Sequence, residues 1–144
     1  ENLSLQEHFN GFAAWNKTHE TGYFLQQTRF MLVMEHGDEL YLAPLITSNW
    51  LKDGCVVSIT NAPTRFGMVS YRITSSVNKG FIEATIEPPT RTPPKQLVLR
   101  LRHPEGKQME SVTLNGEEFK DFDSQGGIIR LKRTKEKLTV KVQY

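Results

Sequence analysis

Residues 67–74 read GMVSYRIT and residues 81–87 read FIEATIE, with the turn sequence NKG between them at 78–80. In both stretches apolar and polar side chains alternate, which is typical of a β-strand with one buried face. Residues 96–102 repeat the pattern, with leucines at 97, 99 and 101. Because short turns join such strands, these segments predict an antiparallel sheet.

Strand and turn signals extend on both sides of this region, from residue 39 to the last residues of the chain. Asn115-Gly116 is the strongest hairpin signal, since both residues tolerate positive φ. Residues 88–94 hold four prolines, which cannot donate ladder hydrogen bonds and predict a crossing from one sheet to another. Roughly eight strands at spacings of about 8–12 residues predict a mainly β fold, an antiparallel β-sandwich.

Before residue 38 the signals are helical. Ser4 and Glu7 fit a capping box, and apolar residues follow at helical spacing, namely Leu5, Phe9 and Phe12. A second helix is predicted to begin after Thr18 and to close at Gly37, the expected left-handed residue at its end. We therefore expect one or two N-terminal helices before the sandwich.

The second predicted helix carries apolar residues on most of its faces, among them Phe24, Leu25, Phe30, Met31, Leu32, Val33 and Met34. A helix that is apolar nearly all round is normally buried, and a sandwich covers only one face of it. We expect the first helix, or a domain outside this chain, to cover the rest. The predicted organisation is a helical lead-in, residues 1–37, that ends a truncated helical domain, and a sandwich domain, residues 38–144.

Composition narrows the choice of partners. The 144 residues include 18 lysines and arginines and 16 acidic residues, and the net charge of +2 gives no reason to expect a nucleic acid or a membrane as partner.

Cys55 is the only cysteine, so neither an intrachain disulfide nor a cysteine-based zinc site is expected. No apolar run approaches the ~20 residues that span a bilayer. We expect no cofactor.

Catalytic motifs are missing from the sequence: there is no Gly-rich phosphate loop, no G-x-S-x-G and no H-E-x-x-H. His19 and Glu20 could act as an acid/base pair, and they are the candidates for substrate binding, but polar residues in a first helical turn are more often capping residues. Glu83 and Glu87 share one strand face, as paired glycosidase carboxylates do, yet an outer sheet face carries such residues anyway. We predict no catalytic residue and no metal site.

Two alternatives to a structural domain follow from the same residues. A sugar-binding module presents exposed aromatic side chains, but Trp15 and Trp50 fall in helical or linker parts rather than on a sheet. A protein-interaction domain is the other alternative. A homodimer that buries Phe24, Met31 and Leu32 of the second helix would indicate it.

Several segments resemble the C-terminal region of large bacterial glycoside-hydrolase-like proteins. Those that resemble the end of their helical toroid are residues 19–27 (HETGYFLQQ), 31–34 (MLVM) and 40–44 (LYLAP). Those that resemble their C-terminal β domain are residues 50–51 (WL), 53–54 (DG), 61–67 (NAPTRFG), 99–104 (LRLRHP) and 111–116 (SVTLNG). The resemblance covers nearly the whole chain, and its motifs are structural ones.

The resemblance implies a parent protein similar to (α/α)6 toroid glycosidases and phosphorylases, whose catalytic carboxylates lie in the toroid. This chain would be a non-catalytic domain that braces the toroid of a carbohydrate-active enzyme. Its partner would be the rest of the parent polypeptide, with carbohydrate as a second candidate. No residue matches the family's acid or base, and Glu20 is the only residue expected near a parental active site. The compartment is not fixed by the sequence, with the periplasm or secretion slightly favoured.

Overall fold

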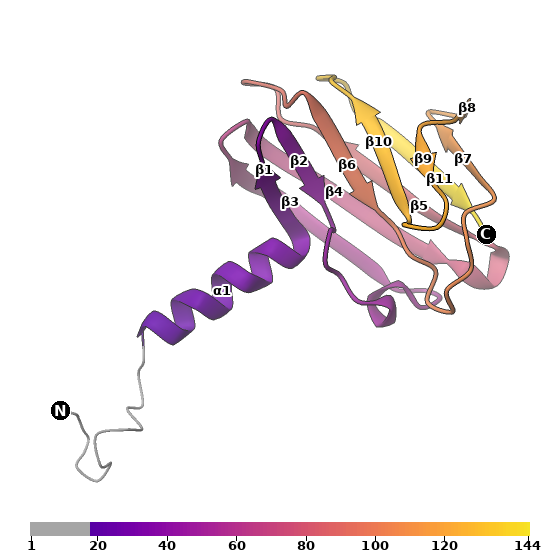
Figure 1. The fold of residues 1–144 in the computed structure, drawn as a ribbon, viewed down its shortest axis with the longest axis horizontal. Coiled ribbons are helices and arrows are strands. Elements are labelled where there is room, and N and C mark those ends of the chain that lie inside the picture. Colours follow the sequence, from indigo (N-terminus) through magenta and orange to yellow (C-terminus); the bar gives the residue numbers. More distant parts are fainter. Residues whose placement is uncertain (1–17) are drawn as a thin grey trace, which may run out of the picture. The chain divides into compact units, whose positions relative to one another are not determined.

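The structure, a computed structural model, describes residues 18–144 (Figure 1). The first predicted helix, from Ser4 to Phe12, and Trp15 lie outside the described residues. Within them the chain forms one α-helix, α1 (Thr18–Leu32), followed by eleven β-strands and two short 3-10 helices. The prediction of a mainly β fold preceded by a helix is confirmed. No helix in this part of the chain combines the length and the apolar character needed to cross a bilayer.

The second predicted helix ends earlier than the sequence suggests. It stops at Leu32, and strands β1 (Val33–His36) and β2 (Glu39–Leu42) form a hairpin. Gly37 takes the predicted left-handed conformation, with φ of 54°, but it does so in the hairpin turn. The predicted helix end was wrong because a short apolar run fits either periodicity. Val33, which pairs with Leu42, is buried as part of a sheet.

Five strands form one sheet, in the order β1-β2-β6-β10-β9. Its remaining members are β6 (Gln96–Arg100), β9 (Phe122–Asp123) and β10 (Ile128–Lys132). Neighbouring strands are antiparallel except β2 and β6, which run parallel with Leu40 opposite Leu97. Parallel neighbours need a long connection, and here that connection contains three strands of the other sheet.

Six strands form the other sheet, in the order β3-β4-β5-β11-β7-β8, and all its neighbours are antiparallel. Its members are β3 (Val56–Thr64), β4 (Gly67–Ser76), β5 (Phe81–Glu87), β7 (Ser111–Leu114), β8 (Glu117–Phe119) and β11 (Leu138–Gln143). The predicted hairpin at Asn115-Gly116 joins β7 to β8, with φ of 53° and 94°. The 3-10 helices η1 (Ser48–Leu51) and η2 (Val77–Lys79) precede β3 and β5.

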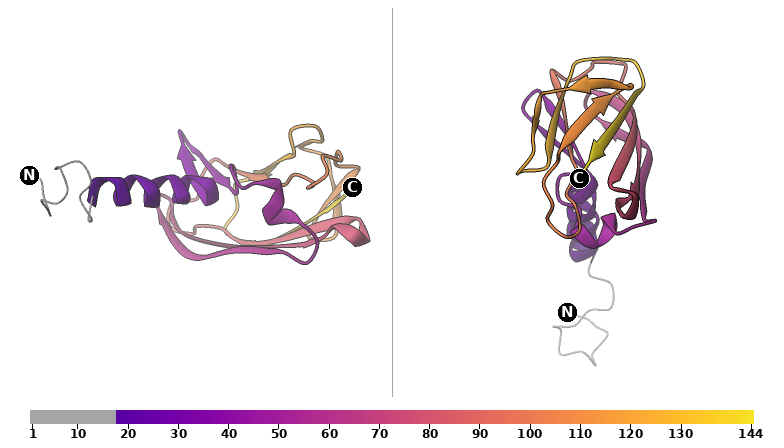
Figure 2. Two further views of the ribbon diagram at one scale, coloured as in Figure 1. Left: turned by 90° about the horizontal axis from the view of Figure 1, so that it is seen from below. Right: turned by 90° about the vertical axis from the view of Figure 1, so that its right-hand side faces the viewer.

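The two sheets lie face to face, and the core fills the space between them (Figure 2). The alternating stretches 67–74, 81–87 and 96–102 each bury their apolar side chains on one face, as predicted. These side chains are Val69, Tyr71, Ile73, Ile82, Ala84, Ile86, Leu97, Leu99 and Leu101. Each large apolar side chain removed from water contributes about 1.5–3 kcal/mol. The chain crosses between the sheets at residues 88–94, as the prolines predicted, and all four prolines are buried.

Backbone carbonyls anchor the end of α1 in the sandwich. The Leu32 carbonyl oxygen accepts hydrogen bonds from the Ala43 N–H (2.8 Å) and from the Tyr71 hydroxyl (3.0 Å). The Met31 carbonyl accepts one from the Leu45 N–H (3.3 Å). The last carbonyls of a helix have no partner inside the helix, so the sandwich supplies the C-terminal cap of α1.

Residues 31–144 form a compact unit that contains all the described strands, together with the last two residues of α1. The anchoring contacts at Met31 and Leu32 therefore belong to the sandwich itself. The division of the chain into the end of a truncated helical domain, residues 1–37, and a sandwich domain, residues 38–144, stays a prediction.

Candidate functional site

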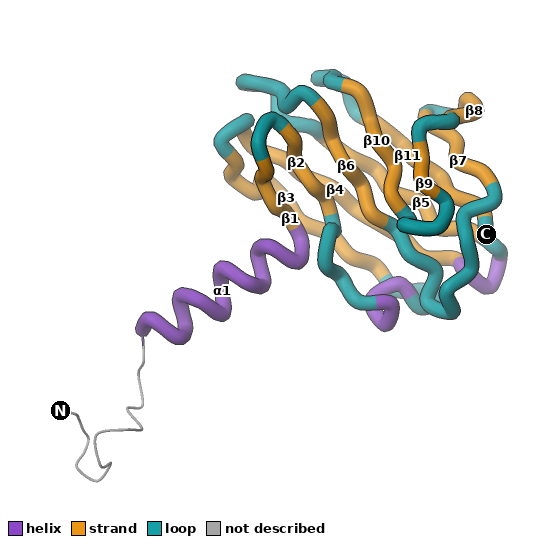
Figure 3. Tube along the Cα trace, viewed as in Figure 1, coloured by secondary structure: helices purple, strands orange, loops and turns teal. Residues whose placement is uncertain are grey.

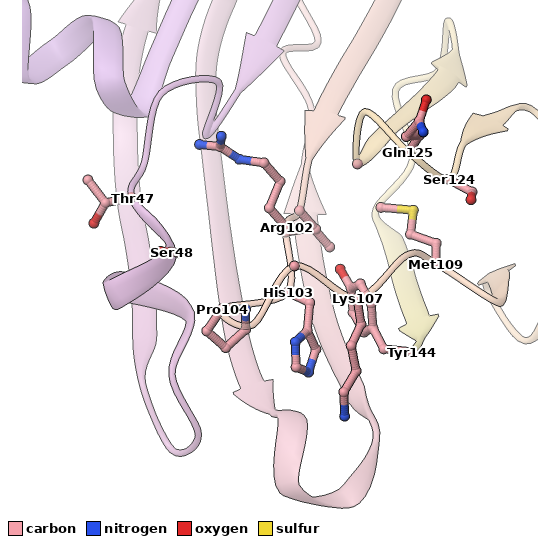
Figure 4. A pocket seen from close by; sticks show the side chains of 13 residues that line it. Thr47, Ser48, Arg102, His103, Pro104, Lys107, Met109, Ser124, Gln125 and Tyr144 are labelled. Carbon is pink, nitrogen blue, oxygen red and sulfur yellow. The ribbon is translucent and has the colours of Figure 1, made fainter.

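A hollow of about 510 Å³ lies at one end of the sandwich (Figure 4). Three loops form it: the loop after β2, the loop after β6 and the turn between β9 and β10. The first two run side by side (Figure 3), because the Arg100 and Arg102 guanidinium groups donate to the carbonyls of Pro44 (3.1 Å) and Ile46 (2.8 Å). The lining residues are Thr47, Ser48, Leu101, Arg102, His103, Pro104, Gly106, Lys107, Met109, Ser124, Gln125, Gly127 and Tyr144.

His103 is the chemically most distinctive residue of this hollow, with only 4% of its surface exposed. Its Nδ1 accepts a hydrogen bond from the Glu105 backbone N–H (3.1 Å), which places the proton of the neutral ring on Nε2. Its ring centroid lies 5.1 Å from that of Tyr144. Burial lowers the pKa of His103; the positive charge of Lys107 lowers it further, and Glu105 opposes this. The neutral ring is the form that fits the site.

This arrangement predicts that acidification destabilises the fold through His103. Because its pKa in the folded protein lies below the ordinary value of 6.5, the unfolded chain binds the proton more readily. Stability contributed by the neutral ring is therefore complete above about pH 6.5 and is lost as the pH falls through the folded pKa. Urea unfolding of the native chain and of His103→Gln between pH 4 and pH 8 should show a shallower acid limb for the variant. Parallel limbs would contradict the prediction.

Tyr144 also lines the hollow, close to His103 (Figure 4). Burial raises the pKa of its hydroxyl, so the phenol stays protonated. Its oxygen is the one side-chain polar atom among residues 18–144 that is both sealed from solvent and without a hydrogen-bond partner. The backbone N–H of Tyr144 donates to the Gly80 carbonyl (3.0 Å), which holds the residue against the end of the six-stranded sheet.

The charges of the hollow do not converge on one point. Its lining includes Arg102 and Lys107 and no carboxylate. The two cationic groups point to opposite sides in Figure 4. The Arg102 guanidinium is occupied by the Ile46 carbonyl, and the Lys107 ammonium lies 3.7 Å from the Glu105 carboxylate. The hollow is a junction at which three loops of the sandwich meet.

Glu83 and Glu87, the two carboxylates on the outer face of β5, each lie beside a different lysine. Glu87 forms an ion pair with Lys137, with 3.5 Å between the Glu87 Oε1 and Lys137 Nζ atoms, and both side chains are exposed. Glu83 lies opposite Lys141 in the register of β5 and β11. The pair therefore fits the expected polar face of an antiparallel sheet.

His19 and Glu20, the sequence-based candidates for substrate binding, both lie in the first turn of α1. The side chain of His19 lies outside the described part, and Glu20 is exposed. The structure assigns neither a substrate. Among the described residues no group of three or more His, Cys, Asp or Glu side chains is placed to hold a metal ion.

A second hollow, about 430 Å³, lies beside β3, and we call it the Trp50 surface. It is lined by Leu32, Asn49, Trp50, Cys55, Val56, Val57 and Ser58, none of which is charged. Trp50 is 36% exposed and Val56 is 44% exposed. The sequence analysis placed Trp50 in a helical or linker part rather than on a sheet, and Trp50 lies in η1. This surface was not predicted, because the residues that form it come from three separate segments.

No family model matches the sequence, and no curated protein matches it significantly. Among solved structures, one match is a GH127 beta-L-arabinofuranosidase from Geobacillus stearothermophilus T6, with 18% sequence identity and a TM-score of 0.43. The match covers 86% of this chain and 18% of that chain, so the chain spans less than a fifth of the enzyme that it matches. That enzyme is a glycoside hydrolase, the class that the sequence resembles. At this TM-score the likeness carries no argument about activity or substrate.

Proposed function

We propose that this chain is the C-terminal β-sandwich of a carbohydrate-active enzyme and that it braces the helical domain that would carry the catalytic residues. The observation that carries the proposal is the anchored end of α1. The sandwich satisfies the terminal carbonyls of Met31 and Leu32 with two backbone N–H groups and the Tyr71 hydroxyl. Three hydrogen bonds therefore join residues 31 and 32, the end of α1, to the strands and loops of the sandwich.

The exposed side chains of α1 support the same role. Tyr23, Phe24 and Leu25 are each more than 60% exposed. Consecutive residues of an α-helix point about 100° apart, so these three large apolar side chains lie on more than one face of α1. Exposed apolar side chains of this number indicate that another part of a protein covers the helix. The resemblance of residues 19–27 and 31–34 to the end of a helical toroid agrees with this interpretation.

Glycoside assays test the proposal directly. This chain and the full parent protein should be assayed against the same panel of aryl glycosides and oligosaccharides. We expect turnover by the parent and none above background by this chain. Robust turnover by the chain alone that is lost in Glu20→Gln, Glu83→Gln or Glu87→Gln would overturn the non-catalytic assignment.

The anchoring itself can be weakened by one substitution. Tyr71→Phe removes the hydroxyl that binds the Leu32 carbonyl and keeps the buried ring, so we expect the free energy of unfolding to fall by about 1 kcal/mol. Amide hydrogen exchange at the last turn of α1 and at Ala43 should become faster. Tyr41→Phe is the matched control, because its hydroxyl binds Glu39 (2.9 Å) on a half-buried strand. Equal exchange rates in the two variants would contradict the anchoring role.

A further inference from the structure

The residues that line the Trp50 surface carry no charge. Charged residues make up 24% of the chain, yet none of the seven lining residues is charged. Two of its apolar side chains, Trp50 and Val56, are exposed. Depletion of charge together with an exposed tryptophan is characteristic of the core of a protein–protein interface.

The strand beside this surface, β3, lies at the edge of its sheet. β3 pairs only with β4, and none of the residues Val56–Thr64 is charged. Edge strands are normally protected from other chains by charges, prolines or bulges. The second half of β3 has both a bulge, between Ile59 and Ala62, and Pro63. The first half has no such protection, and that half lines the Trp50 surface.

We propose that the Trp50 surface is the docking surface for a helix of the parent's helical domain, a part of the polypeptide outside this chain. This inference rests on the proposed function. Leu32 argues for this occupant, because it is the last residue of α1, its carbonyl is anchored in the sandwich, and it also lines the surface. The surface therefore begins where the helical part of the polypeptide enters the sandwich.

The chemistry of the lining fits an apolar helix face better than a sugar. Its polar side-chain groups are those of Asn49 and Ser58, the Trp50 indole N–H and the weakly polar Cys55 thiol, and none of them is charged. Sugar sites place several strong hydrogen-bonding groups around an aromatic ring. Apolar side chains spaced along a helix fill an uncharged hollow of this kind. The same lack of charge suits a permanent contact within one polypeptide.

Hydroxyl-radical footprinting with mass spectrometry measures the accessibility of Trp50 residue by residue, in this chain and in the full parent protein. We expect the oxidation rate of Trp50 to be about tenfold or more lower in the parent, as for a side chain in a fully desolvated interface. Met68 is the internal control, because it is 59% exposed and is not part of the Trp50 surface. Its rate should be equal in the two proteins. A parent with Trp50→Ser should show faster oxidation of Val56, while Met68→Ser should leave Val56 unchanged.

The outcomes separate this inference from the proposed function. If the parent contains a catalytic helical domain and Trp50 is oxidised at the same rate in both proteins, the docking surface is wrong and the bracing role stands. If no helical domain precedes this chain in the parent, the proposed function fails.

Light scattering on this chain alone tests a second copy as the occupant. A dimer that protects Trp50 would identify that copy as the occupant and overturn the proposal. Saturable protection of Trp50 by neutral oligosaccharides would overturn it in favour of a sugar.

Discussion

Gly127→Ala is expected to lower the free energy of unfolding by about 2–5 kcal/mol. Gly127 has φ of 69°, where an L-residue costs roughly 1–2 kcal/mol. An added Cβ would also collide with the Leu101 carbonyl oxygen and lie 2.9 Å from the Arg102 Cγ atom. Overpacking of this kind adds about 1–3 kcal/mol. The backbone cannot move aside easily, because the Leu101 N–H donates to the Gly127 carbonyl (2.8 Å).

Gly54→Ala separates the two contributions. Gly54 has φ of 79°, close to that of Gly127, but no atom lies within 4 Å of an added Cβ. We expect this variant to lose only the backbone contribution, about 1–2 kcal/mol. Urea unfolding of both variants provides the comparison. If the two lose the same free energy, the close approach of the β9–β10 turn to the segment after β6 does not constrain the fold.

Leu99→Ala should be about as costly, with a loss of about 2–5 kcal/mol. Leu99 is fully buried on β6, where it pairs with Ile129 of β10 and Leu42 of β2 in the middle of the five-stranded sheet. Leu45→Ala removes the same atoms from a side chain that is 51% exposed, and we expect a change of less than about 0.5 kcal/mol. Chemical denaturation measures both. Similar losses would mean that β6 does not lie at the centre of the core.

The elements best predicted from sequence were those whose signal is local. Alternation fixed the inward faces of β4, β5 and β6, and Asn115-Gly116 fixed the β7–β8 hairpin, because side-chain burial and turn conformation both follow from a few adjacent residues. The prolines at 88–94 marked the crossing between the sheets for the same reason. The β1–β2 hairpin was missed because Val33 and Met34 continue the apolar pattern of a helix, and only their pairing partners on β2 identify them as a strand.

The sites were less predictable because they join distant segments. His103 begins the stretch His-Pro-Glu-Gly, whose residues are typical of a turn, and nothing in that stretch indicates that Tyr144 packs on its ring. The cap on α1 depends on Ala43, Leu45 and Tyr71, and their relation to Leu32 comes from the sheet topology. The Trp50 surface likewise needs η1, β3 and the end of α1 in their folded positions. One feature of the sequence does point to the Trp50 surface, because the stretch from Gly54 to Thr64 contains no charged residue.

The parallel pairing of β2 with β6 bears on how the chain is made. More than fifty residues separate the end of β2 from the start of β6, and they include β3, β4 and β5. At ~5–20 residues per second, the ribosome extends the chain for roughly 3–10 s after β2 before its partner exists. During that interval Leu40 and Leu42, both fully buried in the finished sheet, lack the strand that covers them. The nascent β1–β2 hairpin therefore leaves the β6 side of β2 unpaired until β6 has been made.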